Sequence, residues 1–241
     1  MAVASTSAIV INALKYSDSS LIVKLYTKQF GLVPYLIRGV LKSKKGKLKA
    51  AYFQPLTQLN VVVSHQEKRN LQSLREAQIL HPYKTLHSNI VKQSLAMFLS
   101  EIIASSIQEE ESNELLYNYL ENSFLWLDSH DAISNFHLLF LLNLSKFLGF
   151  YPDTTHRNLK GFHLKEGVYT HQLNEKDVIK GEGFFLFQKL LGINFDTIES
   201  VKFSKRERAD LLQMLIRYFE LHLGGFRNPK SLEVLETVFS R

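Results

Sequence analysis

The sequence predicts an α+β protein of two domains, a small N-terminal β-barrel followed by a mainly α-helical domain. Three observations support this. The first 80 of the 241 residues are short apolar, β-branched segments separated by polar turns. Beyond Pro82 the apolar residues recur at helical spacing. Residues 1–79 carry twelve Lys and Arg against three Asp and Glu, a net charge of +9, whereas residues 80–241 carry −3. We therefore place the domains at residues 1–80 and 81–241.

Five segments of the first domain have the composition of strands: 7–16, 21–28, 32–38, 56–64 and 70–80. The turns between the first three are short, with the cluster Ser17–Ser20 in one and Gly31 in the next. Five strands without a long helix favour a closed or partly closed barrel, because closure removes exposed sheet edges.

Four helices and a short final one are predicted in the second domain: about 91–103, 113–128, 132–149, 204–219 and 229–239. Asp131 is the expected N-cap of the third helix. That helix is apolar nearly all round, so we expect it at the domain centre, with His137 as a core histidine. Ser204 and Glu207 form a capping box at the start of the fourth.

Between about residues 150 and 180 the helical pattern stops, and the sequence predicts a loop plus a hairpin that turns at Lys165–Gly167. Asp153 and three histidines lie here: His156, His163 and His171. Their spacing matches no zinc signature, so we interpret them as polar loop residues and predict no metal site.

One run of the barrel sequence is strongly basic. The stretch RGVLKSKKGKLK contains six cations and no acid: Arg38, Lys42, Lys44, Lys45, Lys47 and Lys49. Lysines bind phosphates as point charges, which makes the affinity for nucleic acid fall steeply with salt. A loop that only faces water is the alternative. Its position between barrel strands, where loops commonly flank an oligonucleotide groove, favours nucleic-acid binding.

The second strand adds to this interpretation. Alternation places Lys24, Tyr26 and Lys28 on the outer face, where the lysines offer charge to phosphates and the ring offers a stacking surface for a base. Tyr35 of the next strand shares a face with apolar residues and is expected in the core. The predicted nucleic-acid contacts are Lys24, Tyr26, Lys28, Arg38, Lys42, Lys44, Lys45, Lys47, Lys49 and Arg69.

Several functional classes lack their sequence signals. The chain has no Cys, which excludes disulfides and thiol catalysis. Phosphate-binding G-x-x-x-x-G-K-[ST], H-E-x-x-H and G-x-S-x-G motifs are absent. The longest apolar run is broken by polar residues before it reaches bilayer length, and the N-terminus has no signal-peptide pattern. We therefore predict a cytoplasmic protein without enzymatic activity, catalytic residues, cofactors or membrane contact.

Four segments together resemble the RecO family of recombination mediators. They are AIVINALKYSDSSLIVKLYTKQFGLVPYLIRGV, FQPLTQLNVVV after the basic run, LFLLNLSKFLGFYPD in the third predicted helix, and KSLEVL near the end. The order and spacing of the segments carry the resemblance, which covers essentially the whole chain and is closest to Bacteroidetes-type members.

The resemblance implies an N-terminal OB-fold and a helical domain with a small insertion. It implies binding of single- and double-stranded DNA and annealing of complementary strands. It also implies cooperation with RecR in loading RecA onto DNA coated by single-stranded DNA-binding protein. Many family members carry a four-cysteine zinc site after the segment GFYPD, but this chain has no Cys there. We therefore expect the hairpin to be held by its own packing, through Phe162, Leu164, Val168 and Tyr169.

The helical domain is the expected protein-docking surface. The resemblance implies contact with the acidic, hydrophobic C-terminal tail of single-stranded DNA-binding protein, which needs an apolar groove rimmed by cations. The candidate rim residues are Lys205, Arg206, Arg208 and Arg217, with a solvated helix end as the alternative. The residues alone leave open an RNA-binding barrel, a protein-interaction scaffold and a metal-dependent nuclease.

Overall fold

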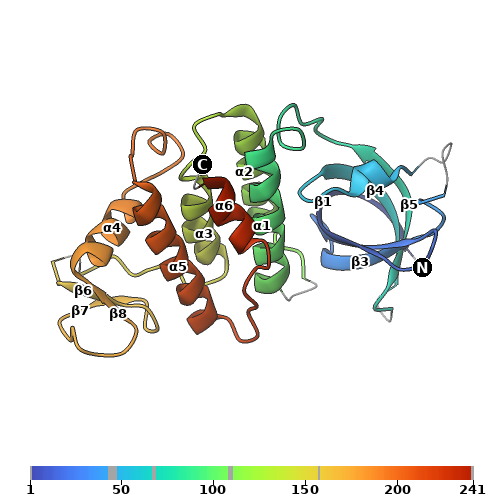
Figure 1. Ribbon diagram of the computed structural model, residues 1–241. Helices are drawn as coiled ribbons and strands as arrows, with labels where there is room; N and C mark the ends of the chain where they lie inside the picture. The colour runs from blue at the N-terminus through green and yellow to red at the C-terminus, as the bar shows by residue number, and fades with distance from the viewer. Residues whose placement is uncertain (1, 43–47, 67–68, 108–110, 157, 240–241) are drawn as a thin grey trace. The chain divides into compact units, whose positions relative to one another are not determined.

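A computed structural model describes residues 2–42, 48–66, 69–107, 111–156 and 158–239 (Figure 1). The chain forms two compact units, Met1–Ser129 and His130–Arg241. The first contains a barrel and two helices, and the second contains further helices and a small sheet. The predicted α+β fold class is confirmed.

The five strands of the barrel (Figure 1) close in the order β1-β2-β3-β5-β4. Its strands are β1 (Ala2–Lys15), β2 (Leu21–Thr27), β3 (Gly31–Ile37), β4 (Gln58–His65) and β5 (Gln72–Ile79). Neighbouring strands are antiparallel except β3 and β5, which are parallel. All five strands coincide with predicted segments to within a few residues, except at the start of β1. The result is an OB-like barrel.

β1 starts five residues before the predicted Ser7, because its first half pairs with β4 from Ala2 opposite His65 onward. A register irregularity between Val10 and Asn12 lies where the strand changes from β4 to β2 as its partner. Bulges of this kind bend a strand and let it close a barrel. The initial residues AVASTS are small, so they give no apolar strand signal.

The barrel interior follows the predicted alternation. Val23 and Leu25 of β2 and Tyr35 of β3 are fully buried in one hydrophobic cluster, whereas Lys24 between them is exposed. The predicted core position of Tyr35 is therefore confirmed. A short 3-10 helix, η1 (Ala50–Phe53), follows the basic run and adds Phe53 to the same cluster.

Two helices complete the first unit: α1 (Ile90–Ser106) and α2 (Glu114–Ser129). Lys92 of α1 is buried, and its Nζ donates to Thr85 Oγ1 at 2.7 Å and to the carbonyl oxygen of Asp128 at 2.9 Å. The carboxylate of Asp128 in turn accepts hydrogen bonds from the backbone N–H groups of residues 84–86. This network joins both helices to the segment that leaves the barrel.

The second unit is built around α3 (Phe136–Phe147), which is buried on nearly all sides as predicted. Its N-cap position is Asn135, so the expectation of Asp131 is wrong. Residues 131–135 are not helical, and the N–H of Ile133 bonds to the Asp131 carbonyl oxygen instead. The side chain of Asn135 donates to the Val201 carbonyl oxygen, which fixes the helix start.

A small antiparallel sheet follows in the order β7-β6-β8, from β6 (Gly161–His163), β7 (Val168–Thr170) and β8 (Val178–Lys180). Gly167 has φ = 70° in the predicted hairpin turn, a conformation that favours glycine. Phe162, Leu164 and Tyr169 are buried as expected. Val168 is 38% exposed, so its predicted packing role is wrong.

The remaining helices are α4 (Gly181–Leu191), α5 (Lys205–His222) and α6 (Leu232–Phe239), with α4 beside the sheet (Figure 1). α4 was not predicted. The capping box of Ser204 and Glu207 is present at the start of α5, as predicted. No helix among the described residues has both the length and the apolar character needed to cross a lipid bilayer.

Candidate nucleic-acid interface

Two connections emerge together at one end of the barrel. Leu21 at the start of β2 pairs with Ile37 at the end of β3, and Tyr35 pairs with Gln72 at the start of β5. The β1–β2 turn and the basic run after β3 therefore meet there, whereas the β4–β5 connection follows His65, which pairs with Ala2 and stacks on Phe30 of the β2–β3 turn. The N–H of Leu41 also donates to the Ser19 carbonyl oxygen at 3.0 Å, so the basic run begins against the β1–β2 turn.

The barrel surface is cationic. The predicted DNA-binding residues Lys24, Arg38, Lys42, Lys49 and Arg69 are all exposed. Within the part of the chain that the structure describes, none of these five forms an ion pair with a carboxylate. The predicted contacts Lys44, Lys45 and Lys47 lie outside the described residues. An exposed cation without a bound carboxylate is available to a phosphate.

Gln72, which the sequence did not single out, organises the β4–β5 connection. Its side chain is 3% exposed, accepts from the N–H of Gln66 at 2.9 Å, and donates to the carbonyl oxygens of Gln66 at 2.8 Å and Arg69 at 2.6 Å. These bonds fix the backbone at Arg69 just before the start of β5. A buried glutamine that bonds to its own loop has no distinct sequence signal.

Tyr26 does not lie where alternation predicts an open surface. It is 1% exposed, its ring is stacked 6.3 Å from that of Tyr117, and its hydroxyl donates to the Asn113 carbonyl oxygen. The α2 helix and the residue before it cover this part of the outer face of β2. The prediction of Tyr26 as an exposed stacking ring is therefore wrong.

Lys28 is also engaged by α2. Its Nζ lies 2.9 Å from the carboxylate of Glu114, and the hydrogen bond and charge of Lys28 lower the pKa of that carboxyl. Both side chains are largely exposed, so the pair contributes little to stability. A phosphate that binds Lys28 would compete with Glu114.

The four candidate docking residues of the second unit have different surroundings. Arg217 forms ion pairs with Asp177 at 3.0 Å and with Glu220 at 3.1 Å, so it connects α5 to the sheet region. Arg206 is exposed and lies 3.8 Å from Asp210. Arg208 donates to the Phe203 carbonyl oxygen, and Lys205 is exposed.

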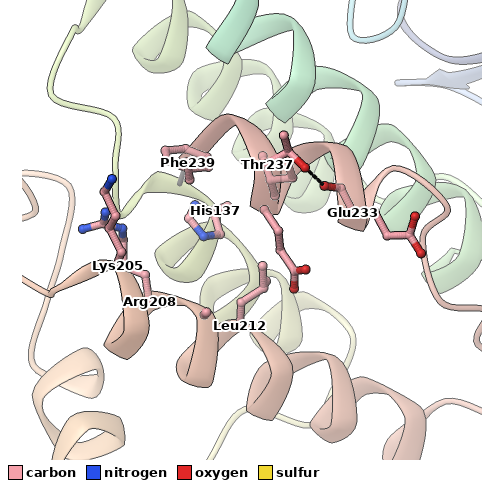
Figure 2. A pocket seen from close by; sticks show the side chains of 10 residues that line it. His137, Lys205, Arg208, Leu212, Glu233, Thr237 and Phe239 are labelled. Carbon is pink, nitrogen blue, oxygen red and sulfur yellow. Dashed lines mark hydrogen bonds between the residues drawn. The ribbon is translucent and has the colours of Figure 1, made fainter. Parts of the chain in front are cut away.

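Lys205 and Arg208 line a pocket of about 490 Å³ between α3, α5 and α6. Figure 2 shows these two cations on one side, Glu233 on the other, and His137 and Phe239 between them. His137 is 2% exposed, as expected for a core histidine. Burial, with a smaller effect of the Arg208 charge, lowers the pKa of His137 to about 3, so the ring is neutral at physiological pH.

The histidines of the insertion do not assemble a metal site. His163 lies 3.5 Å from Glu175, whereas His156 and His171 are exposed. Among the described residues, no three His, Asp or Glu side chains are grouped as metal ligands.

Comparison with known proteins identifies the family. The family model "Recombination protein O N terminal" matches residues 1–83, and "Recombination protein O C terminal" matches residues 87–233. The chain belongs to the RecO family. The match to the N-terminal model covers the barrel, and the match to the C-terminal model begins just before α1. The resemblance seen in the sequence is therefore confirmed.

The relatives match over nearly their whole length. The DNA repair protein RecO of Christiangramia forsetii is 47% identical, across 97% of this chain and 98% of the relative. The proteins of the same name from Flavobacterium johnsoniae and Phocaeicola vulgatus are 44% and 36% identical, each across 98% of both chains. The RecO assignment thus applies to both compact units.

Proposed function

We propose that this RecO-family protein is a DNA-binding recombination mediator that acts in DNA repair without covalent chemistry. It binds single- and double-stranded DNA and anneals complementary strands. Together with RecR it promotes RecA loading onto DNA coated by single-stranded DNA-binding protein. The observation that carries the proposal is the group of exposed barrel cations that have no carboxylate partner in the described part of the chain: Lys24, Arg38, Lys42, Lys49 and Arg69.

The chemistry of such a surface suits annealing. Each lysine or arginine that contacts a phosphate displaces condensed counterions, and this release drives binding without regard to sequence. Two strands held on one cationic surface repel each other less, so base pairing can then proceed. No nucleophile, metal or activated water is needed for these steps.

The pocket between α3, α5 and α6 is our candidate receptor for the tail of single-stranded DNA-binding protein. Its apolar residues, such as Leu212 and Phe239, suit hydrophobic side chains, and Lys205 and Arg208 suit carboxylates. We expect Lys205→Ala with Arg208→Ala to weaken binding of a fluorescent tail peptide about tenfold. Arg206→Ala, which changes a cation outside the pocket, is the control. Equal binding by all variants would remove the pocket from the proposal.

DNA binding by the basic run is tested with the full chain. Alanine at Lys42, Lys44, Lys45, Lys47 and Lys49 should weaken binding to any DNA sequence. The slope of log K against log salt should fall by about 0.7 for each phosphate that the variant no longer binds. The matched control removes the same charge from exposed lysines of the second unit: Lys160, Lys165, Lys176, Lys202 and Lys230.

Fluorescence anisotropy at several salt concentrations measures both quantities. Unchanged affinity and slope in the basic-run variant would contradict the proposal. An RNA oligomer of the same sequence is added as a competitor, because only RNA offers a 2′-hydroxyl. Preference for RNA would favour the alternative of an RNA-binding barrel, and no binding of either would favour a protein scaffold. We place the protein in the cytoplasm, at the nucleoid, as this function requires.

A further inference from the structure

The outer face of β1, β2 and β3 carries apolar side chains that no helix covers in the first unit. Leu14 of β1 pairs with Ile22 of β2, and Ile22 pairs with Leu36 of β3, so the three residues form one row across the strands. The N–H of Tyr16 donates to the Ser20 carbonyl oxygen at 3.0 Å, which continues the β1–β2 ladder past Leu14. Tyr16 therefore shares the outward side with Leu14. We call these four residues the outer strip.

The outer strip is unusually accessible. Leu14 is 59% exposed and Tyr16 is 63% exposed, while Ile22 and Leu36 are partly exposed. Contiguous exposed apolar groups on a soluble protein commonly mark a binding surface. Further along β2, the same outer face is covered at Tyr26 by α2, so the strip is the part that the first unit leaves open.

The charges around the outer strip indicate the ligand. Lys24 is exposed on the outward side of β2, next to Ile22 along the strand, and Arg38 is exposed two residues after Leu36. β1, β2 and β3 contain no Asp or Glu. An apolar surface between cations complements a polyanion whose apolar faces are accessible. Single-stranded nucleic acid has this character, because its bases are free to stack and its phosphates alternate with them.

We propose that the outer strip is the surface that contacts bases, with Tyr16 as the ring on which a base stacks and Lys24 and Arg38 as flanking phosphate contacts. This inference rests on the proposed DNA-binding function and adds a selectivity to it. Bases in a duplex are stacked on each other and cannot lie on Tyr16. The outer strip therefore favours single strands, whereas the basic run binds both forms through phosphates.

The test is Tyr16→Ala in the full chain, with anisotropy of a single-stranded oligomer and of a duplex at several salt concentrations. Removal of one stacking ring should weaken single-strand binding roughly tenfold at every salt concentration, because stacking releases no counterions. The salt slope and duplex affinity should stay unchanged. Tyr16→Phe and Tyr16→Trp should restore binding. Phe185→Ala is the matched control, since Phe185 is 64% exposed on α4 of the second unit.

A crosslink provides a second readout that does not depend on a variant. An oligomer with 5-iodouracil, irradiated on the wild-type protein, should join to Tyr16 or to its neighbours in the outer strip, as located by mass spectrometry. Crosslinks confined to other surfaces would overturn the proposal.

The outcomes separate this inference from the proposed function. Equally weakened binding of single strands and duplex, or unchanged binding by Tyr16→Ala while the basic-run variant binds weakly, would overturn the outer strip and leave DNA binding intact. Unchanged DNA binding with a changed sedimentation coefficient would make the strip a contact between copies of the chain, which also overturns it. Failure of the wild-type protein to bind any DNA would overturn both the proposed DNA-binding function and the role of the outer strip.

Discussion

The barrel and helix α5 both carry several cations, but they differ in the acids around them. β1, β2 and β3 contain no Asp or Glu, whereas α5 contains Glu207, Asp210 and Glu220. On α5, Arg217 and Arg206 lie within ion-pair distance of carboxylates. Within the described residues, Lys24 and Arg38 of the barrel have no such partner.

This difference shows that cation density is a weaker guide to polyanion binding than the lack of nearby acid. A carboxylate within a few ångströms competes with a phosphate for the same cation and repels the phosphate itself. On a surface without acids, a phosphate meets neither this competition nor this repulsion. We therefore expect DNA affinity to depend on barrel cations far more than on an equal number of α5 cations.

Replacing barrel cations by acids should have the largest effect on DNA affinity and is the strongest test of this difference between the barrel and α5. Lys24→Glu combined with Arg38→Glu should reduce single-strand affinity by about a hundredfold or more at low salt, because two attractions are replaced by two repulsions. Arg206→Glu with Lys202→Glu makes the same charge change on exposed residues of the second unit and should alter affinity less than about threefold. Anisotropy titrations compare them, and equal reductions would mean that net charge, not position, governs binding.

Asp128 of α2 is an acid of the first unit that lies outside the barrel and whose negative charge stabilises the fold. Burial alone would raise the pKa of Asp128, but hydrogen bonds from the N–H groups of Lys84, Thr85 and Leu86 and from the Thr85 hydroxyl outweigh it, so the pKa is lowered. We expect Asp128→Asn to lower the free energy of unfolding by about 1–2 kcal/mol at pH 7, through weaker bonds to these donors.

The pH dependence of this destabilisation follows from the direction of the shift. A carboxyl whose folded pKa is lowered contributes stability above its unfolded pKa and loses it as the pH falls through the folded value. The difference between wild type and Asp128→Asn should therefore shrink below about pH 4. Urea unfolding followed by circular dichroism at pH 7 and at lower pH measures the difference in the free energy of unfolding between the two proteins. A difference independent of pH would contradict the role of the charged carboxylate.

Arg217 tests whether a cation of α5 that is paired with acids contributes to DNA binding. If its function is to pair with Asp177 and Glu220, Arg217→Met should lower the unfolding temperature only slightly, since both ion pairs are partly exposed. DNA affinity should be unchanged, in contrast to Arg38→Met. Thermal unfolding and anisotropy on the same preparations test both points, and weaker DNA binding by Arg217→Met would place this cation in the interface.

Much of the fold could be predicted because the chain's local patterns agree with its packing. Alternation located the barrel strands, and the Ser204–Glu207 capping box located the start of α5. α4 was missed because Gly181 and Gly183 are poor helix formers near its start. The helix exists because its phenylalanines pack on the small sheet, with Phe187 4.8 Å from Phe162 between ring centres.

The candidate site was less predictable because periodicity gives the face of a strand but not what covers it. Alternation places Tyr26 and Tyr16 on outward sides of their strands, yet α2 buries one and leaves the other 63% exposed. That outcome depends on contacts between residues nearly ninety positions apart, such as Tyr26 with Asn113. The hydrogen bond from the Gln72 side chain that fixes the backbone at Arg69 could not be predicted from the sequence either.

The pair of Lys28 and Glu114 is the one place where a carboxylate reaches the predicted barrel cations among the described residues. Glu114→Gln should release Lys28 and raise single-strand affinity about two- to threefold at low salt, with a slope steeper by up to about 0.7. Glu199→Gln, an exposed acid of the second unit, controls for net charge.

A double-mutant cycle decides whether this gain comes through Lys28. If Lys28 contacts phosphate once released, Glu114→Gln should have no effect when Lys28 is already alanine. The advantage should also vanish as the pH falls through the lowered pKa of Glu114, because the wild-type side chain then loses its charge as well. A gain that persists without Lys28 would mean that Glu114 repels DNA directly. The lack of acids in β1, β2 and β3 would then matter beyond ion-pair distance, and the comparison with α5 would depend on the electrostatic field of the whole surface rather than on individual ion pairs.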